Sequence, residues 1–242
     1  MGDFETPQGR RRACLLGGLL YLGIIAGGIF AEVFVRQGVL VSGDPQATAI
    51  NVLANEGLYR AGFGVSLMFL AFNLPLLLVF FQLLRRVNNS LALLMAFFFI
   101  VACSVEIMNI VNHLNALEIH GYDPDQLGLT SAQMAALGYL SLQYFNTGFG
   151  VALVYFGFYF LLLGFLIVRS RFLPAFAGML LILAGVGYLS NSFALFLVPS
   201  LSSLLFPWVL LPALIAELTI ALWLLFKGVD ERYWPETPLP EA

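Results

Sequence analysis

The sequence predicts an all-α bundle of six transmembrane helices, and three observations lead to this fold class. Hydrophobic residues occupy 60% of the 242 positions and charged residues only 10%, whereas soluble domains carry about 25% charged residues. The mean hydropathy is +0.91. Six apolar stretches are each long enough to cross a bilayer core, which takes about 20 helical residues. This composition excludes a soluble globular protein and a nucleic-acid-binding protein.

The six predicted spans run from Cys14 to Val35, Leu58 to Leu84, Leu91 to Leu117, Met134 to Val168, Phe172 to Leu197 and Leu205 to Phe226. The second and fourth are longer than a bilayer requires, so we expect them to tilt or to extend beyond the membrane. The predicted organisation is therefore a tail over residues 1–12, a single membrane domain over 13–228 and a second tail over 229–242. The second tail is polar and contains proline, which predicts disorder.

The first span follows Arg10, Arg11 and Arg12, as the apolar region of a secretory signal peptide would. That region of a signal peptide has about 7–15 residues, and the apolar run here is longer. Glu32 also interrupts the zone where cleavage would occur. We therefore expect a first helix that is retained.

Local signals mark two helix starts in the loops. Gly43-Asp44-Pro45 predicts a short helix with Asp44 as its N-cap and Pro45 at its first position. Apolar residues then recur on one face, so we expect this helix to lie along the membrane interface. Thr130 and Gln133 form a predicted capping box that opens the fourth span.

The distribution of basic residues predicts the orientation. With the N-terminus in the cytoplasm, nine of the 11 lysines and arginines fall on the cytoplasmic side, and only Arg36 and Arg60 fall outside. Cytoplasmic loops of membrane proteins are enriched in Lys and Arg. An even number of spans returns the C-terminus to the cytoplasm as well.

An internal repeat links the second and fourth spans. Gly62-Phe63-Gly64-Val65 recurs as Gly148-Phe149-Gly150-Val151, and both spans end in a basic turn. The pattern indicates a duplicated helix hairpin whose two copies have the same orientation. Chance similarity is the alternative, because Phe and Gly are common in membrane helices. Glycines in the first and fifth spans, Gly178 and Gly185 among them, predict close helix contacts.

Polar side chains inside the spans are the candidate functional residues, because a charge in hydrocarbon costs on the order of 3 kcal/mol and needs a partner or a function. Glu106, Asn109 and His113 share one helix face at i, i+3, i+7 spacing. We predict an outward-facing polar pocket lined by Glu32, Arg60, Glu106, Asn109, His113, Asn146, Asn191 and Glu217. In the structural alternative, Glu32 pairs with Arg36 or Arg60, and the asparagines make only interhelical hydrogen bonds.

Several function classes stay open. The leading prediction is recognition of a small or lipid-like ligand in this pocket, with a sensory or regulatory role, in which Arg60 binds an anionic group and Glu106 with His113 supplies proton-linked polarity. The alternative is a proton-linked secondary transporter, for which Pro75 and Pro212 are candidate helix kinks.

Two further classes have less support. A zinc hydrolase would use Glu106, His113 and Glu217, but the chain has two histidines and no HExxH motif. A structural accessory subunit also fits six spans without a soluble domain. We expect no catalytic residue, no cofactor, no resident metal and no nucleic-acid partner; the expected partners are the lipid bilayer and the ligand.

Dispersed motifs carry a family resemblance. They are Gly43-Asp44-Pro45 with Thr48, Asn51, Glu56 and Arg60, the turn Arg169-Ser170-Arg171-Phe172-Leu173-Pro174, Gly178, Ala184-Gly185-Val186-Gly187-Tyr188-Leu189, and Leu222-Trp223-Leu224-Leu225 with Lys227-Gly228. From about Arg10 to Val229, the chain resembles a bacterial membrane family catalogued as a domain of unknown function, number forty-three eighty-six. The resemblance implies a multi-pass protein of the bacterial cytoplasmic (inner) membrane. It implies no activity, substrate or catalytic residue.

Overall fold

The computed structural model describes residues 4–235, and over these residues the chain forms helices and no strand. Six helical segments are long and apolar enough to cross a membrane, which confirms the predicted all-α membrane fold. They run over Pro7–Val39, Glu56–Leu84, Asn89–Gly121, Ser131–Ser170, Ala175–Leu197 and Trp208–Phe226. Each overlaps one predicted span, and the first four are longer than predicted.

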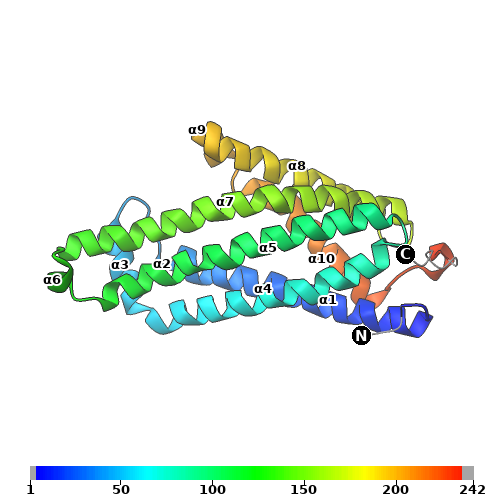
Figure 1. Ribbon diagram of the computed structural model, residues 1–242, viewed down its shortest axis with the longest axis horizontal. Helices are drawn as coiled ribbons and strands as arrows, with labels where there is room; N and C mark the ends of the chain where they lie inside the picture. The colour runs from blue at the N-terminus through cyan, green and yellow to red at the C-terminus, as the bar shows by residue number, and fades with distance from the viewer. Residues whose placement is uncertain (1–3, 236–242) are drawn as a thin grey trace. The chain divides into compact units, whose positions relative to one another are not determined.

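The elements follow one another as α1 (Pro7–Ile29), the π-helical η1 (Phe30–Arg36), α2 (Gln37–Val39), α3 (Pro45–Ala54), α4 (Glu56–Leu84), α5 (Asn89–Glu118), the 3₁₀ turn η2 (Ile119–Gly121), α6 (Pro124–Leu127), α7 (Ser131–Ser170), α8 (Ala175–Leu197), α9 (Pro199–Leu205), η3 (Trp208–Leu210), α10 (Leu211–Phe226) and η4 (Glu231–Tyr233) (Figure 1). The helix α7 has 40 residues, which at about 1.5 Å per residue give a length of about 60 Å. This is about twice the ~30 Å hydrocarbon core of a bilayer, so α7 is longer than one span requires.

Helix ends follow local capping chemistry. The Asp44 carboxylate accepts a hydrogen bond from the Ala47 N–H at 2.9 Å, which confirms the predicted start of α3. The predicted capping box is also confirmed, because the Gln133 N–H donates to Thr130 Oγ1 at 3.3 Å and the Thr130 N–H donates to Gln133 Oε1 at 2.8 Å.

The helix α1 begins at Pro7 rather than at Cys14, the first residue of the predicted span. The Thr6 hydroxyl accepts from the Gly9 N–H at 3.1 Å. Proline suits the first position of a helix, where its missing N–H has no intrahelical partner. Thr6-Pro7 is therefore a start signal that lies outside the apolar run used for the prediction.

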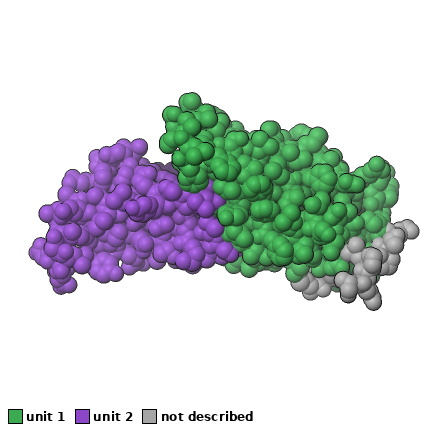
Figure 2. Space-filling view, turned by 45° about the horizontal axis from the view of Figure 1, so that its top comes forward, with its two compact units in different colours: residues 1–25, 71–103, 152–242 green, residues 26–70, 104–151 purple. Residues whose placement is uncertain are grey.

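The chain divides into two compact units (Figure 2). Unit 1 contains residues 1–25, 71–103 and 152–242, and unit 2 contains residues 26–70 and 104–151. Among the described residues, unit 1 has nine basic and four acidic side chains, whereas unit 2 has two basic and seven acidic ones. The two units therefore carry formal charge of opposite sign.

In unit 1, α7 and α8 pack through two reciprocal pairs of glycines. A Cβ on Gly164 would stand 2.5 Å from the Gly178 carbonyl oxygen, and a Cβ on Gly178 would stand 2.8 Å from the Gly164 oxygen. Gly157 and Gly185 face each other in the same way, at 3.1 and 2.7 Å. The glycines are seven residues apart on each helix, so the backbones stay close over two turns.

The ordered part of the C-terminal tail also belongs to unit 1. The predicted disorder is wrong for residues 229–235, because η4 forms there and Trp234 is buried with its ring centroid 5.1 Å from that of Phe172. The Asp230 N–H also donates to the Phe172 carbonyl at 3.1 Å. The rest of the predicted tail, residues 236–242, lies outside the described residues.

In unit 2, seven buried side chains form an apolar core. Val35, Val39, Val52, Tyr59, Ala116, Leu117 and Leu142 make up this core, and all are buried. Gly62 of α4 admits Val35, because a Cβ on residue 62 would lie 2.8 Å from a Val35 methyl carbon. The first glycine of the repeated tetrapeptide is therefore a helix contact.

Candidate functional site

The first span changes to a π-helical turn, η1, in its second half. The turn covers Phe30–Arg36 and includes Glu32 and Arg36. π-helical turns are rare and are frequent at functional sites, because the wider turn redirects the side chains that it carries. Neither the apolar pattern nor the preceding Gly27-Gly28 predicts this turn.

Arg36 is held from two sides. Its guanidinium forms an ion pair with Glu32, with Nη2 2.6 Å from Oε2, and Nε donates to the same oxygen at 2.7 Å. The guanidinium carbon also lies 4.2 Å from the centroid of the Phe145 ring of α7. The Arg36 side chain is 14% exposed and that of Glu32 is 40% exposed, so Glu32 is the more accessible partner.

Glu106 of α5 lies within electrostatic range of Arg36 and of Glu32. It is buried, and its carboxylate accepts a long hydrogen bond of 3.4 Å from Asn109 Nδ2. The same amide nitrogen donates to the Phe145 carbonyl at 3.0 Å. We call Glu32, Arg36, Glu106, Asn109 and Phe145 the polar cluster; all five belong to unit 2.

Gly148 makes room for Asn109. The amide oxygen of Asn109 stands in the place that a Cβ on residue 148 would occupy. The amide oxygen also accepts from Asn112 Nδ2 at 3.3 Å. The second copy of the repeated tetrapeptide therefore admits a polar side chain where the first copy admits a valine.

His113 lies one turn farther along α5 and is fully buried against Tyr59. The two rings stack with centroids 4.1 Å apart at an angle of 11°. Tyr59 donates its hydroxyl to the His113 carbonyl at 2.9 Å, and His113 Nε2 lies 3.2 Å from the Tyr59 carbonyl oxygen. Because a carbonyl only accepts, Nε2 carries the proton of this bond. Within residues 4–235, His113 Nδ1 has no hydrogen-bond partner.

Arg60 and Asn146 also belong to unit 2 but lie outside the polar cluster. Arg60 is half exposed and forms ion pairs of 2.8 Å with both Glu56 and Glu118. Two carboxylates already occupy its guanidinium, so an anionic ligand would have to displace one of them. Asn146 is exposed on α7.

Asn191 and Glu217 belong to unit 1 and have local partners there. Asn191 is buried, and its amide oxygen accepts from the Ser202 hydroxyl at 3.2 Å. Glu217 of α10 is partly buried and hydrogen-bonded to Tyr21 of α1. The buried Tyr159 and Tyr188 lie within electrostatic range of the same carboxyl group.

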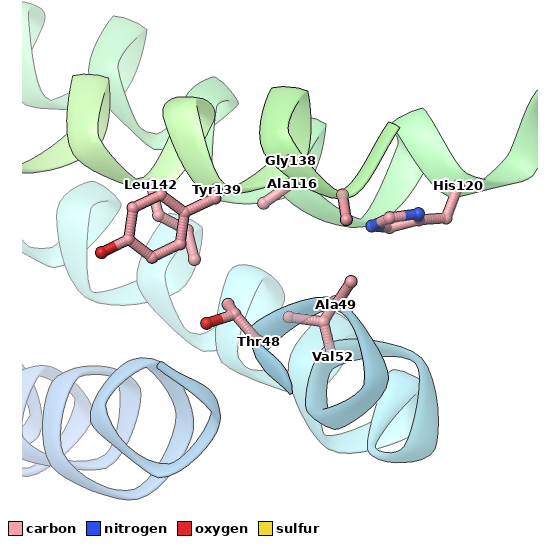
Figure 3. A pocket seen from close by; sticks show the side chains of 9 residues that line it. Thr48, Ala49, Val52, Ala116, His120, Gly138, Tyr139 and Leu142 are labelled. Atoms are coloured by element: carbon pink, nitrogen blue, oxygen red, sulfur yellow. The ribbon is translucent and has the colours of Figure 1, made fainter. Parts of the chain in front are cut away.

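A small pocket in unit 2 lies apart from these residues (Figure 3). It is a partly open depression without room for a water molecule, whereas pockets for drug-sized ligands enclose about 300–1,000 Å³. Its lining consists of Thr48, Ala49, Val52, Ala116, His120, Ala135, Gly138, Tyr139 and Leu142, and none of the predicted site residues is among them.

Metal chemistry has no ligand set in the part of the chain that the structure describes. No group of three His, Cys, Asp or Glu side chains there is arranged to hold a metal ion. The zinc alternative built on Glu106, His113 and Glu217 therefore has no support from the arrangement of these residues.

Sequence reasoning did not single out Tyr59 and Phe145, the aromatic partners of His113 and Arg36. The chain has 9 tyrosines and 23 phenylalanines, and no local pattern distinguishes these two from the others. Glu32 and Arg36 are different, because their i, i+4 spacing is a visible signal for an ion pair.

A protein-family model matches most of the chain. Residues 16–228 match the model described as "Domain of unknown function (DUF4386)". No curated protein and no solved structure matches the chain.

Proposed function

The chain belongs to the DUF4386 family, whose function is unknown, and we propose that it binds a small or lipid-like ligand at the polar cluster of unit 2, in a sensory or regulatory role. It is a multi-pass membrane protein. The observation that supports the proposal is the π-helical turn that places the largely covered Arg36 between Glu32 and Phe145, beside the buried Glu106. An ionisable group inside a membrane span costs free energy and is therefore a candidate functional residue.

The charge of the cluster indicates the chemistry of the ligand. Two carboxyl groups, Glu32 and Glu106, lie near one guanidinium, so the cluster has an excess of acidic groups. Unit 2 as a whole has seven acidic and two basic side chains, so its electrostatic field is negative, as it is at the cluster. We therefore propose a ligand that carries an ammonium group. Glu106 and Asn109 would accept its hydrogen bonds, and the more exposed Glu32 would turn from Arg36 toward it.

The other residues predicted from the sequence have smaller parts or none in this proposal. Arg60 and Asn146 are exposed in the same unit but lie outside the polar cluster, and the positive charge of Arg60 would not attract an ammonium group, so neither residue is part of the proposed site. His113 would hold α5 against α4 through Tyr59. Asn191 and Glu217 belong to unit 1 and do not support this site.

Native mass spectrometry of the full chain released from lipid nanodiscs tests the proposal. We expect a bound amine-containing species of fixed mass on the wild type. Glu106→Gln should lose it, because a neutral amide removes the charge and keeps the shape. Glu56→Gln is the matched control, since Glu56 is an exposed carboxylate of the same unit. A bare wild-type polypeptide, or equal retention by Glu106→Gln, would overturn the proposal.

We also propose that the protein lies in the bacterial cytoplasmic membrane with both termini in the cytoplasm, on the basis of the nine-to-two distribution of Lys and Arg. Cysteine labelling tests this orientation, because the native Cys14 and Cys103 are both buried and give little background. A membrane-impermeant maleimide should label Gln46→Cys in intact cells. It should label Ser90→Cys only after the cells are permeabilised; the reverse pattern would contradict the orientation.

A proton-linked transporter is the second candidate, and one observation favours it. Glu217 is an acid within the last span and is hydrogen-bonded to Tyr21 in the first. Pro75 lies inside α4, where it interrupts the backbone ladder, whereas Pro212 lies in the first turn of α10 and is no longer a candidate kink. Solute uptake into proteoliposomes that requires both a pH gradient and Glu217 would favour this function over ligand sensing.

A further inference from the structure

One end of unit 1 gathers the ends of several helices around Trp234. The guanidinium of Arg10 lies 4.7 Å from the Trp234 ring and that of Arg86 lies 5.8 Å from it. The Phe172 ring, in the turn between α7 and α8, packs on the same indole. Arg11 donates to the Leu224 carbonyl at 3.0 Å, which adds the end of α10. The start of α1 and the ends of α4, α7 and α10 therefore meet here.

Three acidic side chains at this end each have an arginine partner. Glu231 forms a 2.5 Å ion pair with Arg10, Glu5 pairs with Arg86, and Asp230 pairs with Arg232 at 2.7 Å. The other basic side chains at this end of unit 1 have no carboxylate partner among the described residues. They are Arg12, Arg85, Arg169, Arg171 and Lys227, which we call the basic collar; Arg11 is excluded because helix carbonyls occupy it.

Three members of the basic collar have their cationic groups close to an aromatic ring. Lys227 Nζ lies 4.3 Å from the Trp223 ring, and the guanidinium carbons of Arg85 and Arg169 lie 5.9 Å from the Phe81 and Phe165 rings, respectively. Each ring is four residues before its cation, in the last turns of the helix. Tryptophan is typical of the level where lipid headgroups begin, so Trp223 with Lys227 marks that level.

Arg171 adds an independent observation. Its φ is +60°, and it is the one residue other than glycine with positive φ among residues 4–235. Glycine or asparagine adopts this conformation at lower cost than arginine does. Its side chain is exposed and has no carboxylate partner in the described structure, so the ion pairs do not explain why arginine is there. Strained positions of this kind indicate a functional side chain.

We infer that the basic collar is a binding surface for the headgroups of anionic phospholipids. The guanidinium fork fits phosphate oxygens in pairs, and the collar lies at the ends of membrane spans, where such phosphates are concentrated. The charge of unit 1, nine basic against four acidic side chains among those described, is complementary to an anionic leaflet. Arg169 lies in the last turn of α7 and Arg171 in the connection to α8, so two members of the basic collar stand two residues apart.

Lipid titration followed by native mass spectrometry tests this surface. The full chain in neutral detergent is titrated with phosphatidylglycerol, with phosphatidylcholine and with inorganic phosphate. We expect phosphatidylglycerol to bind best and phosphatidylcholine to bind weakly. Phosphate alone should not compete at the same concentration, because it lacks the acyl chains. Equal binding of the two lipids, or full displacement by phosphate, would overturn the inference.

Two variants and a matched control locate the surface. Arg169→Gln with Arg171→Gln should weaken phosphatidylglycerol binding by about 25-fold, since each basic residue contributes about fivefold at an anionic surface. Arg232→Gln is the control, because Arg232 is exposed at the same end and already paired with Asp230. Equal loss in both variants, or no loss in the double variant, would contradict the inference.

Arg171→Gly separates binding from folding. Glycine relieves the positive φ, so this variant should unfold at a higher temperature than the wild type while it binds phosphatidylglycerol less tightly. Higher stability with unchanged lipid binding would show that the arginine does not act on the lipid.

Discussion

Asn109 and Gly148 share one place in the structure: the amide oxygen of Asn109 stands where a Cβ on residue 148 would be. The glycine allows α5 and α7 to approach until the Asn109 amide reaches the Phe145 carbonyl, 3.0 Å away. That bond fixes Asn109 beside Glu106. The shape of the polar cluster therefore depends on a residue without a side chain.

The first prediction concerns this glycine. Gly148→Ala should lower the free energy of unfolding by about 1–3 kcal/mol, because the new methyl group displaces Asn109. Gly64→Ala is the matched control in the other copy of the tetrapeptide, where no atom lies within 4 Å. Alanine should be neutral there, or stabilise the helix by up to about 1 kcal/mol. Thermal unfolding in detergent compares the two; equal melting temperatures would contradict the assigned contact.

The contact between α7 and α8 gives a second prediction. Gly164→Ala should destabilise unit 1 by about 1–3 kcal/mol, since the added carbon would meet the Gly178 carbonyl oxygen 2.5 Å away. The Gly178 carbonyl is part of the helix backbone, so it cannot change rotamer to relieve the clash as a side chain can. Gly187→Ala, whose nearest contact would be an ordinary 3.5 Å, is the comparison and should melt near the wild-type temperature. If both variants melt alike, the close approach of these helices is not as described.

A third prediction concerns Tyr59 and His113. Tyr59→Phe keeps the stacked ring and removes the hydroxyl that donates to the His113 carbonyl, so it should cost about 0.5–1.5 kcal/mol of unfolding free energy. Tyr144→Phe should cost nothing measurable, because Tyr144 is exposed. Chemical unfolding of the purified chain distinguishes these outcomes, and a neutral Tyr59→Phe would show that the hydroxyl contributes nothing to the fold.

The fourth prediction is a dependence on pH outside the membrane spans. Hydrogen bonds from Arg232 hold the pKa of Asp230 below its ordinary value of 3.8. A lowered pKa stabilises the folded state above pH 3.8, and this contribution is lost as the pH falls through the folded-state pKa. Asp230→Asn should therefore flatten the loss of stability below pH 4 by a small amount, because both side chains meet water. If the variant and the wild type have the same dependence of stability on pH, the Asp230 carboxylate does not contribute to stability in this way.

Most of the fold was predictable because each helix is marked by residues that are consecutive or close together in the sequence. The length and hydropathy of a stretch identify a membrane span without knowledge of its neighbours. The caps at Asp44 and Thr130 depend on residues within three positions, so local spacing predicted them as well. The start of α1 was missed for a related reason, since Thr6-Pro7 lies among polar residues that a search for apolar runs passes over.

The candidate site was less predictable, because its contacts join residues far apart in the chain. The sequence allowed Glu32 to pair with either of two arginines. The packed helices show that Glu32 pairs with Arg36, whereas Arg60 pairs with Glu118 of α5. A π-helical turn follows from tertiary packing and has no reliable sequence signal. The repeated tetrapeptide was visible in the sequence. The sequence did not show that its first glycine contacts Val35 in one copy and Asn109 in the other.

Arg11 has a consequence for the order in which the molecule is made. It donates to the carbonyls of Leu224 and Leu225, which end the last span and have no partner within their own helix. The ribosome synthesises α1 first and α10 last. The two hydrogen bonds of Arg11 can therefore form only after almost the entire chain has been synthesised. A chain cut short before residue 224 therefore lacks both carbonyl acceptors of Arg11, and its first span has no hydrogen bond to the last one through this residue.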